Sequence, residues 1–372
     1  MGDVLLLGCG LIGTSIGLAL ARDATASGTQ VDVLLHDTNP DSLSAAALRG
    51  AGRPWDGEER ARLVICAVPP GATAATLAQA QSHDLGSTYT HVCSVQSLVQ
   101  AEVERLGCDL SAIVGGHPMA GRETSGPAGA SHDLFAGRPW AVCPSVESSH
   151  QALEAVLALV AACGGEPLVV EPGLHDASVA LLSHLPHLTS AALAGLLSDG
   201  AGRNAHPAPL AGPGLADTTR LAAGNAELWT QILVANAAHI SPVLRDLVHS
   251  LSGLADELDR IVAGDESADQ ARDAVHAFLL RGNQGRAMVP LKRGAVAERF
   301  ATVRVEVADR PGTLAALLGL AGQLGVNVED VRVEHEPGRP RGLVDLAVAA
   351  HSVDVLSDAL LAQGWTVLDA PV

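Results

Sequence analysis

The sequence of 372 residues is poor in aromatic side chains and in positive charge. Phe, Trp and Tyr together make up 2% of it, so its cores must be built from Ala, Leu and Val. Its 23 Lys and Arg residues stand against 41 Asp and Glu residues, which gives a net charge of -18. Such a chain repels phosphate backbones, and no basic stripe with interleaved aromatic residues offsets this repulsion. We therefore expect no nucleic-acid partner.

Cysteine pairs, a leader and long apolar runs are also missing. The six cysteines form no CxxC pair and mostly lie in apolar runs, which indicates a reducing, cytoplasmic location. The chain opens without a basic segment, and glycines interrupt the apolar run that follows, so we expect no signal peptide. No uninterrupted apolar stretch reaches the ~18 residues of a membrane helix, so we expect no membrane partner.

The length and the local patterns predict three domains. Residues 1–147 alternate short strands with helices, which predicts an α/β Rossmann-like dinucleotide-binding domain with a parallel sheet. Residues 148–282 hold long Ala- and Leu-rich runs with few strand signals, which predicts an all-α domain that packs on itself or on a second subunit. A linker is expected at 283–299. Residues 300–372 then show the βαββαβ order of a ferredoxin-like domain.

A glycine fingerprint follows the first expected strand and opens the first expected helix. Its residues are Gly8, Gly10, Leu11, Ile12 and Gly13. The glycines permit a tight turn and close approach of a pyrophosphate, and the helix N-terminus offers free N–H groups to it. Asp37, 24 residues after the last glycine, can accept hydrogen bonds from ribose hydroxyls and would repel a 2′-phosphate, so we expect NAD. The alternatives are a glycine turn without a ligand and a capping role for Asp37.

His117 is the main candidate for a catalytic group. It stands between glycine and proline just past an expected strand at 112–115, and α/β folds bind ligands at the carboxyl ends of strands. The ordinary pKa of histidine suits a general base near neutral pH. Ser94, at the end of the expected strand at 91–94, is a second polar group on that edge or the N-cap of the next helix. The alternative for His117 is a structural histidine.

Three motifs occur in order behind the glycine fingerprint. They are Gly116-His-Pro-Met-Ala-Gly121, Ser183-His-Leu-Pro-His187 and Ala211-Gly-Pro-Gly-Leu-Ala-Asp217-Thr-Thr-Arg220. Together they make residues 1–290 resemble prephenate dehydrogenase of tyrosine biosynthesis. Pro213 and Leu215 depart from the family pattern, which usually has glycine and phenylalanine there. The C-terminal part resembles an ACT regulatory domain, with Asp309-Arg-Pro-Gly312 as its turn signature.

The resemblance implies roles for residues of the substrate site. His117 would accept the proton of the ring hydroxyl, Ser94 would hydrogen-bond to this hydroxyl and to the histidine, and Arg220 would hold a carboxylate. Other positions that match the family's site are Asp217, Glu123, His175, His184, His187 and Trp229. Alternatives stay open: Asp217 and Arg220 form a helix-surface ion pair, and His175 is an ordinary surface residue. His184 and His187 lack the third ligand that zinc needs, so we expect no metal.

The resemblance also implies regulation and a homodimer. Asp309, Pro311, Gly312 and Asn327 would bind tyrosine as a feedback effector between paired ACT domains. The alternative is a domain that only supports dimer contacts. Regulation would require that tyrosine bind two states of the dimer with different affinity.

The expected function is oxidative decarboxylation of prephenate to 4-hydroxyphenylpyruvate with reduction of NAD. One alternative is arogenate dehydrogenase. Another is a different hydroxyacid dehydrogenase, which would normally supply a lysine base in the helical domain, whereas the chain's only lysine is Lys292. The alternative outside the enzymes is a catalytically silent amino-acid sensor that uses the ACT module.

Overall fold

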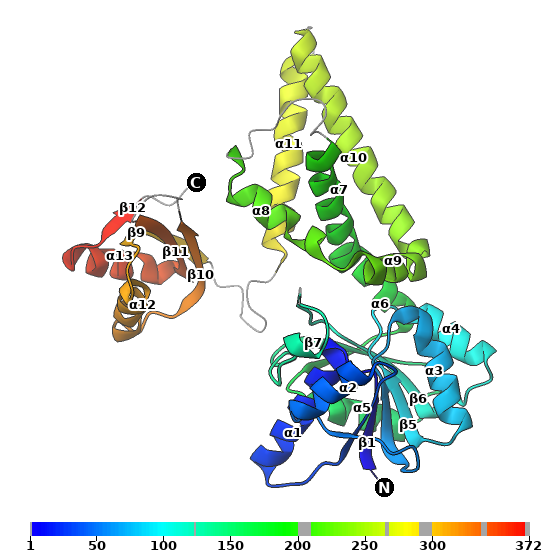
Figure 1. The fold of residues 1–372 in the computed structure, drawn as a ribbon. Helices are drawn as coiled ribbons and strands as arrows, with labels where there is room; N and C mark the ends of the chain where they lie inside the picture. The colour runs from blue at the N-terminus through cyan, green and yellow to red at the C-terminus, as the bar shows by residue number, and fades with distance from the viewer. Residues whose placement is uncertain are drawn as a thin grey trace. The chain divides into compact units, whose positions relative to one another are not determined.

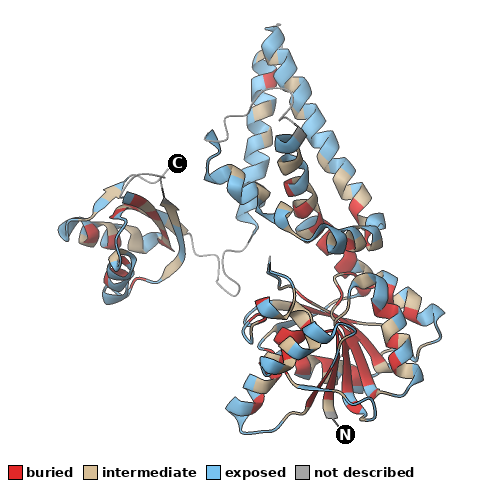
Figure 2. Cartoon of the chain, viewed as in Figure 1, coloured by how far each residue is buried: buried red, intermediate tan, exposed pale blue. Residues whose placement is uncertain are grey.

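The computed structural model describes residues 2–122, 124–199, 210–264, 268–289, 300–335 and 341–368. It divides into two compact units, Met1–Ser250 and Leu251–Val372. Figure 1 shows the elements of both units, and Figure 2 shows where their residues are buried.

The first unit is built on an eight-stranded sheet. Its strands are β1 (Gly2–Leu7), β2 (Val33–His36), β3 (Arg53–Pro54), β4 (Ala61–Cys66), β5 (Gly86–His91), β6 (Ile113–Pro118), β7 (Pro139–Pro144) and β8 (Glu166–Val169). Their order is β3-β2-β1-β4-β5-β6-β7-β8. Two hydrophobic cores lie on the two faces of the sheet, as in a doubly wound fold. The predicted α/β Rossmann-like domain is confirmed.

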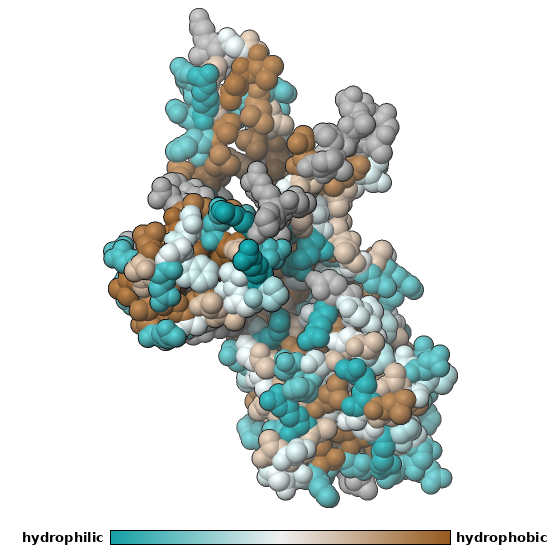
Figure 3. All heavy atoms as spheres, turned by 60° about the vertical axis from the view of Figure 1, so that its left-hand side comes forward, coloured by the Kyte–Doolittle hydropathy of each residue, from teal (hydrophilic) through white to brown (hydrophobic). Residues whose placement is uncertain are grey.

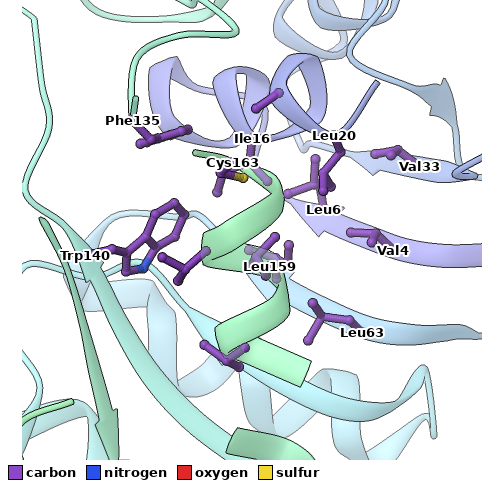
Figure 4. Packing of buried hydrophobic residues seen from close by; sticks show 14 of the residues in the cluster. Val4, Leu6, Ile16, Leu20, Val33, Leu63, Phe135, Trp140, Leu159 and Cys163 are labelled. Atoms are coloured by element: carbon purple, nitrogen blue, oxygen red, sulfur yellow. The ribbon is translucent and has the colours of Figure 1, made fainter. Parts of the chain in front are cut away.

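Five helices cover the two faces of this sheet. They are α1 (Leu11–Ser27), α2 (Pro40–Leu48), α3 (Pro70–Ser82), α4 (Ser97–Arg105) and α5 (His150–Ala162). Side chains of α1, α2 and α5 share one core with Val4 and Leu6 of β1, while α3 and α4 share the other with Leu5 and Leu7. The alternation of β1 between two buried faces explains its unbroken apolar sequence. The first core also holds the ring pair Phe135 and Trp140, with centroids 4.9 Å apart (Figure 4).

The sheet differs from the expectation at its far edge. β7 pairs antiparallel with β6, so the sheet is not wholly parallel. Between these strands the described chain has no α-helix, only the short 3₁₀ turn Pro127–Gly129, and antiparallel neighbours need no helical crossover. α5 then returns the chain so that β8 pairs parallel with β7. The expected boundary at residue 147 is therefore too early, since α5 and β8 belong to the α/β layer. β8 was missed because it is an exposed edge strand without apolar alternation.

A helical segment follows the sheet. It contains α6 (Pro172–Val179), the π-helix Ala180–His184, α7 (Leu185–Asp199), α8 (Pro213–Thr219), the 3₁₀ turn Arg220–Ala223, α9 (Ala226–Ala235) and α10 (Ala237–Ala263), whose last residues belong to the second unit. The predicted helical domain is confirmed. Hydrophobic side chains are exposed over this part of the chain (Figure 3), among them Leu182 (73% exposed) and Leu196 (66%). An apolar face of this size on helices indicates a packing partner.

One helical run differs from the expectation about membranes. Among the described helices, the run Pro172–Ser198 is long and apolar enough to cross a membrane. It also carries five buried polar side chains that take part in packing within the first unit, namely His175, Asp176, His184, His187 and Ser190. We therefore interpret the run as a packing helix.

The second unit contains a four-stranded antiparallel sheet. After α11 (Ala268–Ala287) come β9 (Phe300–Ala308), α12 (Thr313–Gln323), β10 (Val328–His335), β11 (Arg341–Ala349), α13 (Val353–Ala362) and β12 (Thr366–Leu368). The strand order is β10-β11-β9-β12, and a core of valines and leucines lies against the two helices. The predicted βαββαβ order is confirmed, and the ACT assignment stays a prediction. The expected linker begins too early, because α11 continues to Ala287; residues 290–299 lie outside the described residues.

Candidate active site

The glycine loop has the shape that a dinucleotide requires. Gly8 has a φ of +106°, which a residue with a side chain rarely adopts. A Cβ on Gly13 would clash with the carbonyl oxygen of Gly8, whereas a Cβ on Gly10 would meet no atom within 4 Å. No side chain caps the N-terminus of α1, so its N–H groups face this open space. The residues present fit the pyrophosphate of a dinucleotide.

Asp37 lies beside this loop, directly after β2. Its Oδ2 accepts a hydrogen bond from the Cys9 N–H at 2.6 Å, and its Oδ1 accepts one from the Asn39 N–H at 2.7 Å. Asn39, and not Asp37, caps α2, because its side chain accepts from the first N–H groups of that helix. Asp37 therefore does not cap the next helix, while its bond from the Asn39 N–H is that of a turn cap. The carboxylate is held at the edge of the loop, where the ribose of a dinucleotide lies in this fold.

His117 is the penultimate residue of β6, so it lies within the strand and not just past it. The two glycines before it have packing roles. A Cβ on Gly115 would clash with Oε1 of Gln96, and a Cβ on Gly116 would lie 3.0 Å from Nε1 of Trp140. The backbone of β6 is thereby packed tightly on both sides just before the imidazole, which is itself half-buried.

A chain of hydrogen bonds joins His117 to a carboxylate. Nδ1 of His117 lies 2.9 Å from Nε2 of His175, and Nδ1 of His175 lies 2.8 Å from Oδ1 of Asp176. An ionised carboxylate only accepts, so Nδ1 of His175 carries a proton and its Nε2 accepts in turn. His117 must then donate from Nδ1, which leaves its Nε2 as a bare acceptor. This arrangement prepares His117 to take a proton from a ligand.

Asp176 also caps helix α4 from a distant part of the chain. Its Oδ1 and Oδ2 accept hydrogen bonds from the N–H groups of Gln96 (2.9 Å) and Ser97 (2.8 Å). Burial alone would raise the pKa of Asp176, but the hydrogen bonds from His175 and from these two N–H groups outweigh burial and lower the pKa. The carboxylate therefore stays ionised inside the protein.

Ser94 does not have the contacts expected of it. The strand before it ends at His91, and α4 begins at Ser97 with Asp176 as its cap, so the N-cap interpretation of Ser94 is wrong. Within the described residues Ser94 Oγ makes no hydrogen bond, and the implied bond to His117 is absent. Ser94 follows β5, the neighbour of β6, so it lies at the same sheet edge as His117.

Burial keeps the histidines around this edge neutral. Burial, together with the nearby His175 and His184, lowers the pKa of His117 to about 3. It lowers the pKa of His91 and of His184 to about 4. The expected ordinary histidine pKa is thus wrong for His117. The consequence is an unprotonated imidazole at neutral pH.

The remaining predicted histidines lie on the side of the site that the helical segment contributes. His175 (3% exposed) is no surface residue. The ring of His187 stacks on Trp229 with centroids 3.6 Å apart, and His184 meets the edge of the same indole. A Cβ on Gly224 would lie 2.7 Å from the indole nitrogen, so this stack fits closely against the turn before α9.

His184 is also held by an asparagine. Nδ2 of Asn236 donates to the backbone oxygen of Asp176 at 2.8 Å and lies 3.1 Å from Nδ1 of His184. The π-helix Ala180–His184 sets the rotation of His184 relative to His175, since a π turn shifts the following side chains around the helix axis. Such insertions are frequent at functional sites.

Other predicted residues lie outside this cluster of contacts. Arg220 and Asp217 are exposed, on the 3₁₀ turn and on α8. Their segment is fixed to α7 by a hydrogen bond from the Ala222 N–H to Ser190 Oγ at 3.0 Å. Glu123 lies outside the described residues. Among the described residues, no group of three or more His, Cys, Asp or Glu side chains is arranged to hold a metal.

The predicted regulatory residues lie in the second unit. Gly312 has a φ of +89° and is the N-cap of α12, with Asp309 and Pro311 in the turn before it. The side chain of Asn327 donates to Glu329. This geometry is that of a tight turn at a helix N-terminus, and the tyrosine site stays a prediction.

Two matches to family models decide the classification. Residues 20–169 match the model described as prephenate dehydrogenase, nucleotide-binding domain, and residues 171–277 match prephenate dehydrogenase, dimerization domain. The chain belongs to the prephenate dehydrogenase family. The boundary between the two matches also agrees with the end of β8 at Val169.

Curated relatives match either nearly the whole chain or about two thirds of it. A probable prephenate dehydrogenase of Streptomyces niveus, NovF, is 35% identical over 367 residues, 98% of this chain and 99% of that protein. A cyclohexadienyl dehydrogenase of Zymomonas mobilis is 29% identical over 262 residues, 68% of this chain and 86% of the relative. The family prediction is confirmed.

Solved structures of the prephenate dehydrogenase family share the fold. A prephenate dehydrogenase from A. aeolicus, in complex with hydroxyphenyl propionate and NAD+, has a TM-score of 0.68 at 24% identity, covering 77% of this chain and 97% of that chain. An arogenate dehydrogenase from Synechocystis has a TM-score of 0.61 at 24% identity, covering 76% and 98%. At this identity the likeness concerns the fold alone.

Two important residues of the site had no motif to reveal them. Asp176 follows His175 directly, and this His-Asp pair was the one signal for it. Asn236 lies between α9 and α10, and nothing local distinguishes it from a helix-ending asparagine. Both act on the site through contacts between residues more than 50 positions apart.

Proposed function

We propose that this protein oxidises and decarboxylates prephenate to 4-hydroxyphenylpyruvate, with NAD as the hydride acceptor, in the cytoplasm. The observation that carries the proposal is the chain Asp176–His175–His117 at the carboxyl edge of the sheet. It presents an unprotonated imidazole nitrogen at the same carboxyl edge of the sheet from which the glycine loop after β1 extends. Family membership supports the same reaction class.

His117 acts as the base in this proposal. The substrate hydroxyl donates to Nε2 of His117, which takes the proton as the carbonyl forms. The positive charge that arises on His117 is shared through His175 with the ionised Asp176, so it is compensated inside the protein. The chemistry that NAD supplies when bound is acceptance of the hydride from the hydroxyl-bearing carbon. Loss of carbon dioxide then makes the ring aromatic and drives the reaction.

Substrate binding needs positive charge in a chain of net charge -18. Prephenate is a dianion, and the guanidinium of Arg220 offers a two-point hydrogen bond to one carboxylate. In the proposal, the substrate also contacts Asp217 on α8 and the stacked rings of His187 and Trp229. Ser94 reaches the substrate hydroxyl from the neighbouring strand end.

Asp37 selects NAD over NADP in this proposal. Its carboxylate is fixed by two backbone N–H groups beside the glycine loop. An ionised carboxylate there accepts hydrogen bonds from ribose hydroxyls and repels a 2′-phosphate.

The protein acts as a homodimer in this proposal. The exposed leucines of the run Pro172–Ser198 need a covering surface, and the matching family model describes a dimerization domain. Light scattering should give twice the chain mass of 37.9 kDa. We also propose that tyrosine binds at the turn with Asp309, Pro311 and Gly312, with Asn327 nearby, and inhibits the enzyme.

The proposal is tested by following NADH with prephenate and with arogenate, each with and without tyrosine. We expect turnover with prephenate, formation of 4-hydroxyphenylpyruvate, and inhibition by tyrosine. Turnover with arogenate alone would assign the other substrate, and turnover with neither would refute the proposal. Full activity at saturating tyrosine would refute the proposed inhibition by tyrosine and leave the proposed reaction standing.

A further inference from the structure

Asn236 makes three side-chain hydrogen bonds at the junction of α9 and α10. It is 1% exposed. Its Nδ2 donates to the backbone oxygen of Asp176 at 2.8 Å and contacts Nδ1 of His184 at 3.1 Å, while its Oδ1 lies 2.9 Å from Nδ1 of His239. The amide thus uses both of its N–H groups and its oxygen within the protein.

The orientation of this amide follows from its partners. A backbone oxygen accepts and never donates, so the NH₂ group of Asn236 must face Asp176. The second N–H of that group then points at His184, and Nδ1 of His184 must accept it. A neutral imidazole with an accepting Nδ1 carries its proton on Nε2. If His184 were protonated on both nitrogens, its Nδ1–H would face the N–H of Asn236, and two donors cannot form a hydrogen bond with each other.

The proton on Nε2 of His184 points away from Asn236, because the two nitrogens lie on different sides of the imidazole ring. Within the described residues no protein group accepts it. The sealed side-chain atoms without partners are Gln96 Oε1, Ser97 Oγ and Trp140 Nε1, and Nε2 of His184 is not one of them. His184 is close enough to His117 to influence its protonation, and its ring meets the edge of Trp229. His184 is therefore a donor without an acceptor among the described residues, within electrostatic range of His117.

We propose that Asn236 is a positioning residue that fixes His184 with its proton on Nε2, so that His184 donates a hydrogen bond to an oxygen of the substrate. The inference rests on the proposed function for the identity of the substrate. The two histidines then have different roles. His117 accepts a proton from the substrate, and His184 donates a hydrogen bond but keeps its proton. One amide links them, because it also holds the peptide of Asp176.

The tautomer is tested first, since its measurement needs no substrate. Nitrogen-15 labelling of the histidines in the full chain, with His184 assigned from the variant His184→Gln, reports which ring nitrogen carries the proton. We expect Nε2–H in the wild type and a mixture of tautomers in Asn236→Ala. Nδ1–H in the wild type, or an unchanged tautomer in Asn236→Ala, would overturn the proposal. Failure of prephenate turnover would refute the proposed function and leave this result standing.

Kinetics test the donor role. Asn236→Ala should lower kcat/KM for prephenate about 10- to 100-fold, with KM for NAD unchanged. The matched control is Asn225→Ala, which removes the N-cap of α9 and should lower thermal stability without changing the His184 tautomer. A loss of activity in Asn236→Ala no larger than that in Asn225→Ala would contradict the proposal.

A second set of variants covers the case in which Asn236→Ala does not fold. His184→Gln keeps an N–H donor, whereas His184→Phe has none, so His184→Gln should be at least tenfold more active. Where Asn236→Ala folds, adding it to His184→Gln should change kcat/KM by less than twofold, because the tautomer no longer matters. Equal loss in His184→Gln and His184→Phe, or full additivity in the double variant, would overturn the proposal.

Discussion

The carboxylate of Asp176 lies 2.8 Å from Nδ1 of His175, and the two side chains are 1% and 3% exposed. A buried carboxylate is costly unless it is fully hydrogen-bonded. Asp176 meets this condition by capping α4, a helix 80 residues earlier in the chain. Its position therefore serves two purposes: it joins the helical segment to the nucleotide-binding layer, and it fixes the proton on His175, the hydrogen-bond partner of His117.

Asp176→Asn should lower kcat for prephenate about 10²- to 10³-fold. The amide removes the negative charge that raises the pKa of His117, and it no longer fixes the His175 proton on Nδ1. The acid limb of the pH profile of kcat/KM should move to lower pH, which a purely structural loss would not cause.

The control for this variant is Glu171→Gln. Glu171 caps α6 through two backbone N–H groups, as Asp176 caps α4, but it contacts no catalytic histidine. The Glu171→Gln variant should be less stable than the wild type, but its pH profile of kcat/KM should be unchanged. If both variants behave alike, Asp176 acts only as a helix cap.

Gly224→Ala should raise KM for prephenate about tenfold, on the scale of an overpacked contact. The backbone of Gly224 is extended, so alanine fits it without strain. The added Cβ would lie 2.7 Å from Nε1 of Trp229 and 3.0 Å from Cε1 of His187, which displaces their stack. Gly195→Ala, a helix position where a Cβ meets nothing within 4 Å, is the control and should leave KM unchanged. If KM is unchanged in both variants, the stack of His187 on Trp229 does not contribute to substrate binding.

Asp37→Ala should narrow the preference for NAD over NADP by about 10- to 100-fold. The change removes the acceptor for ribose hydroxyls and the repulsion of a 2′-phosphate. The ratio of kcat/KM for the two cofactors measures it. Asp32→Ala, which breaks a surface ion pair with Arg53, should leave the ratio unchanged. A wild type that already prefers NADP would show that our interpretation of Asp37 is wrong.

The buried histidines should make the protein acid-sensitive. His91 has a folded pKa of about 4, against about 6.5 in the unfolded chain, because burial opposes its charge. Below pH 6.5 the unfolded chain binds a proton that the folded chain does not, so the stabilisation is complete above pH 6.5 and is lost as the pH falls to about 4. His91 alone accounts for about 3 kcal/mol of this loss.

Thermal unfolding between pH 7 and pH 4.5 checks this dependence. His91→Asn keeps an acceptor for the Cys93 N–H and should flatten the curve. A midpoint that does not change with pH in the wild type would contradict the assignment of a neutral buried histidine.

What the sequence predicted well was local. The strand, glycine turn and helix at the start of the chain and the βαββαβ order near its end each depend on a few adjacent residues whose geometry is fixed locally. The hydrogen-bond network around His117 depends instead on contacts between distant segments, such as Asn236 with His184 and Asp176 with Gln96. No local pattern contains those contacts. The same reason explains why the sequence left open a helix-cap role for Ser94, which Asp176 fills instead, and why the reversed direction of β7 was missed.

The variant His117→Asn tests the central claim most directly. Asparagine is close in size and polarity but cannot accept the hydroxyl proton as a base. NADH formation from prephenate should fall about 10²- to 10⁴-fold in single-turnover measurements, while the Kd for NAD stays at the wild-type value. A variant that forms NADH at the wild-type rate would show that the imidazole at this position is not the base.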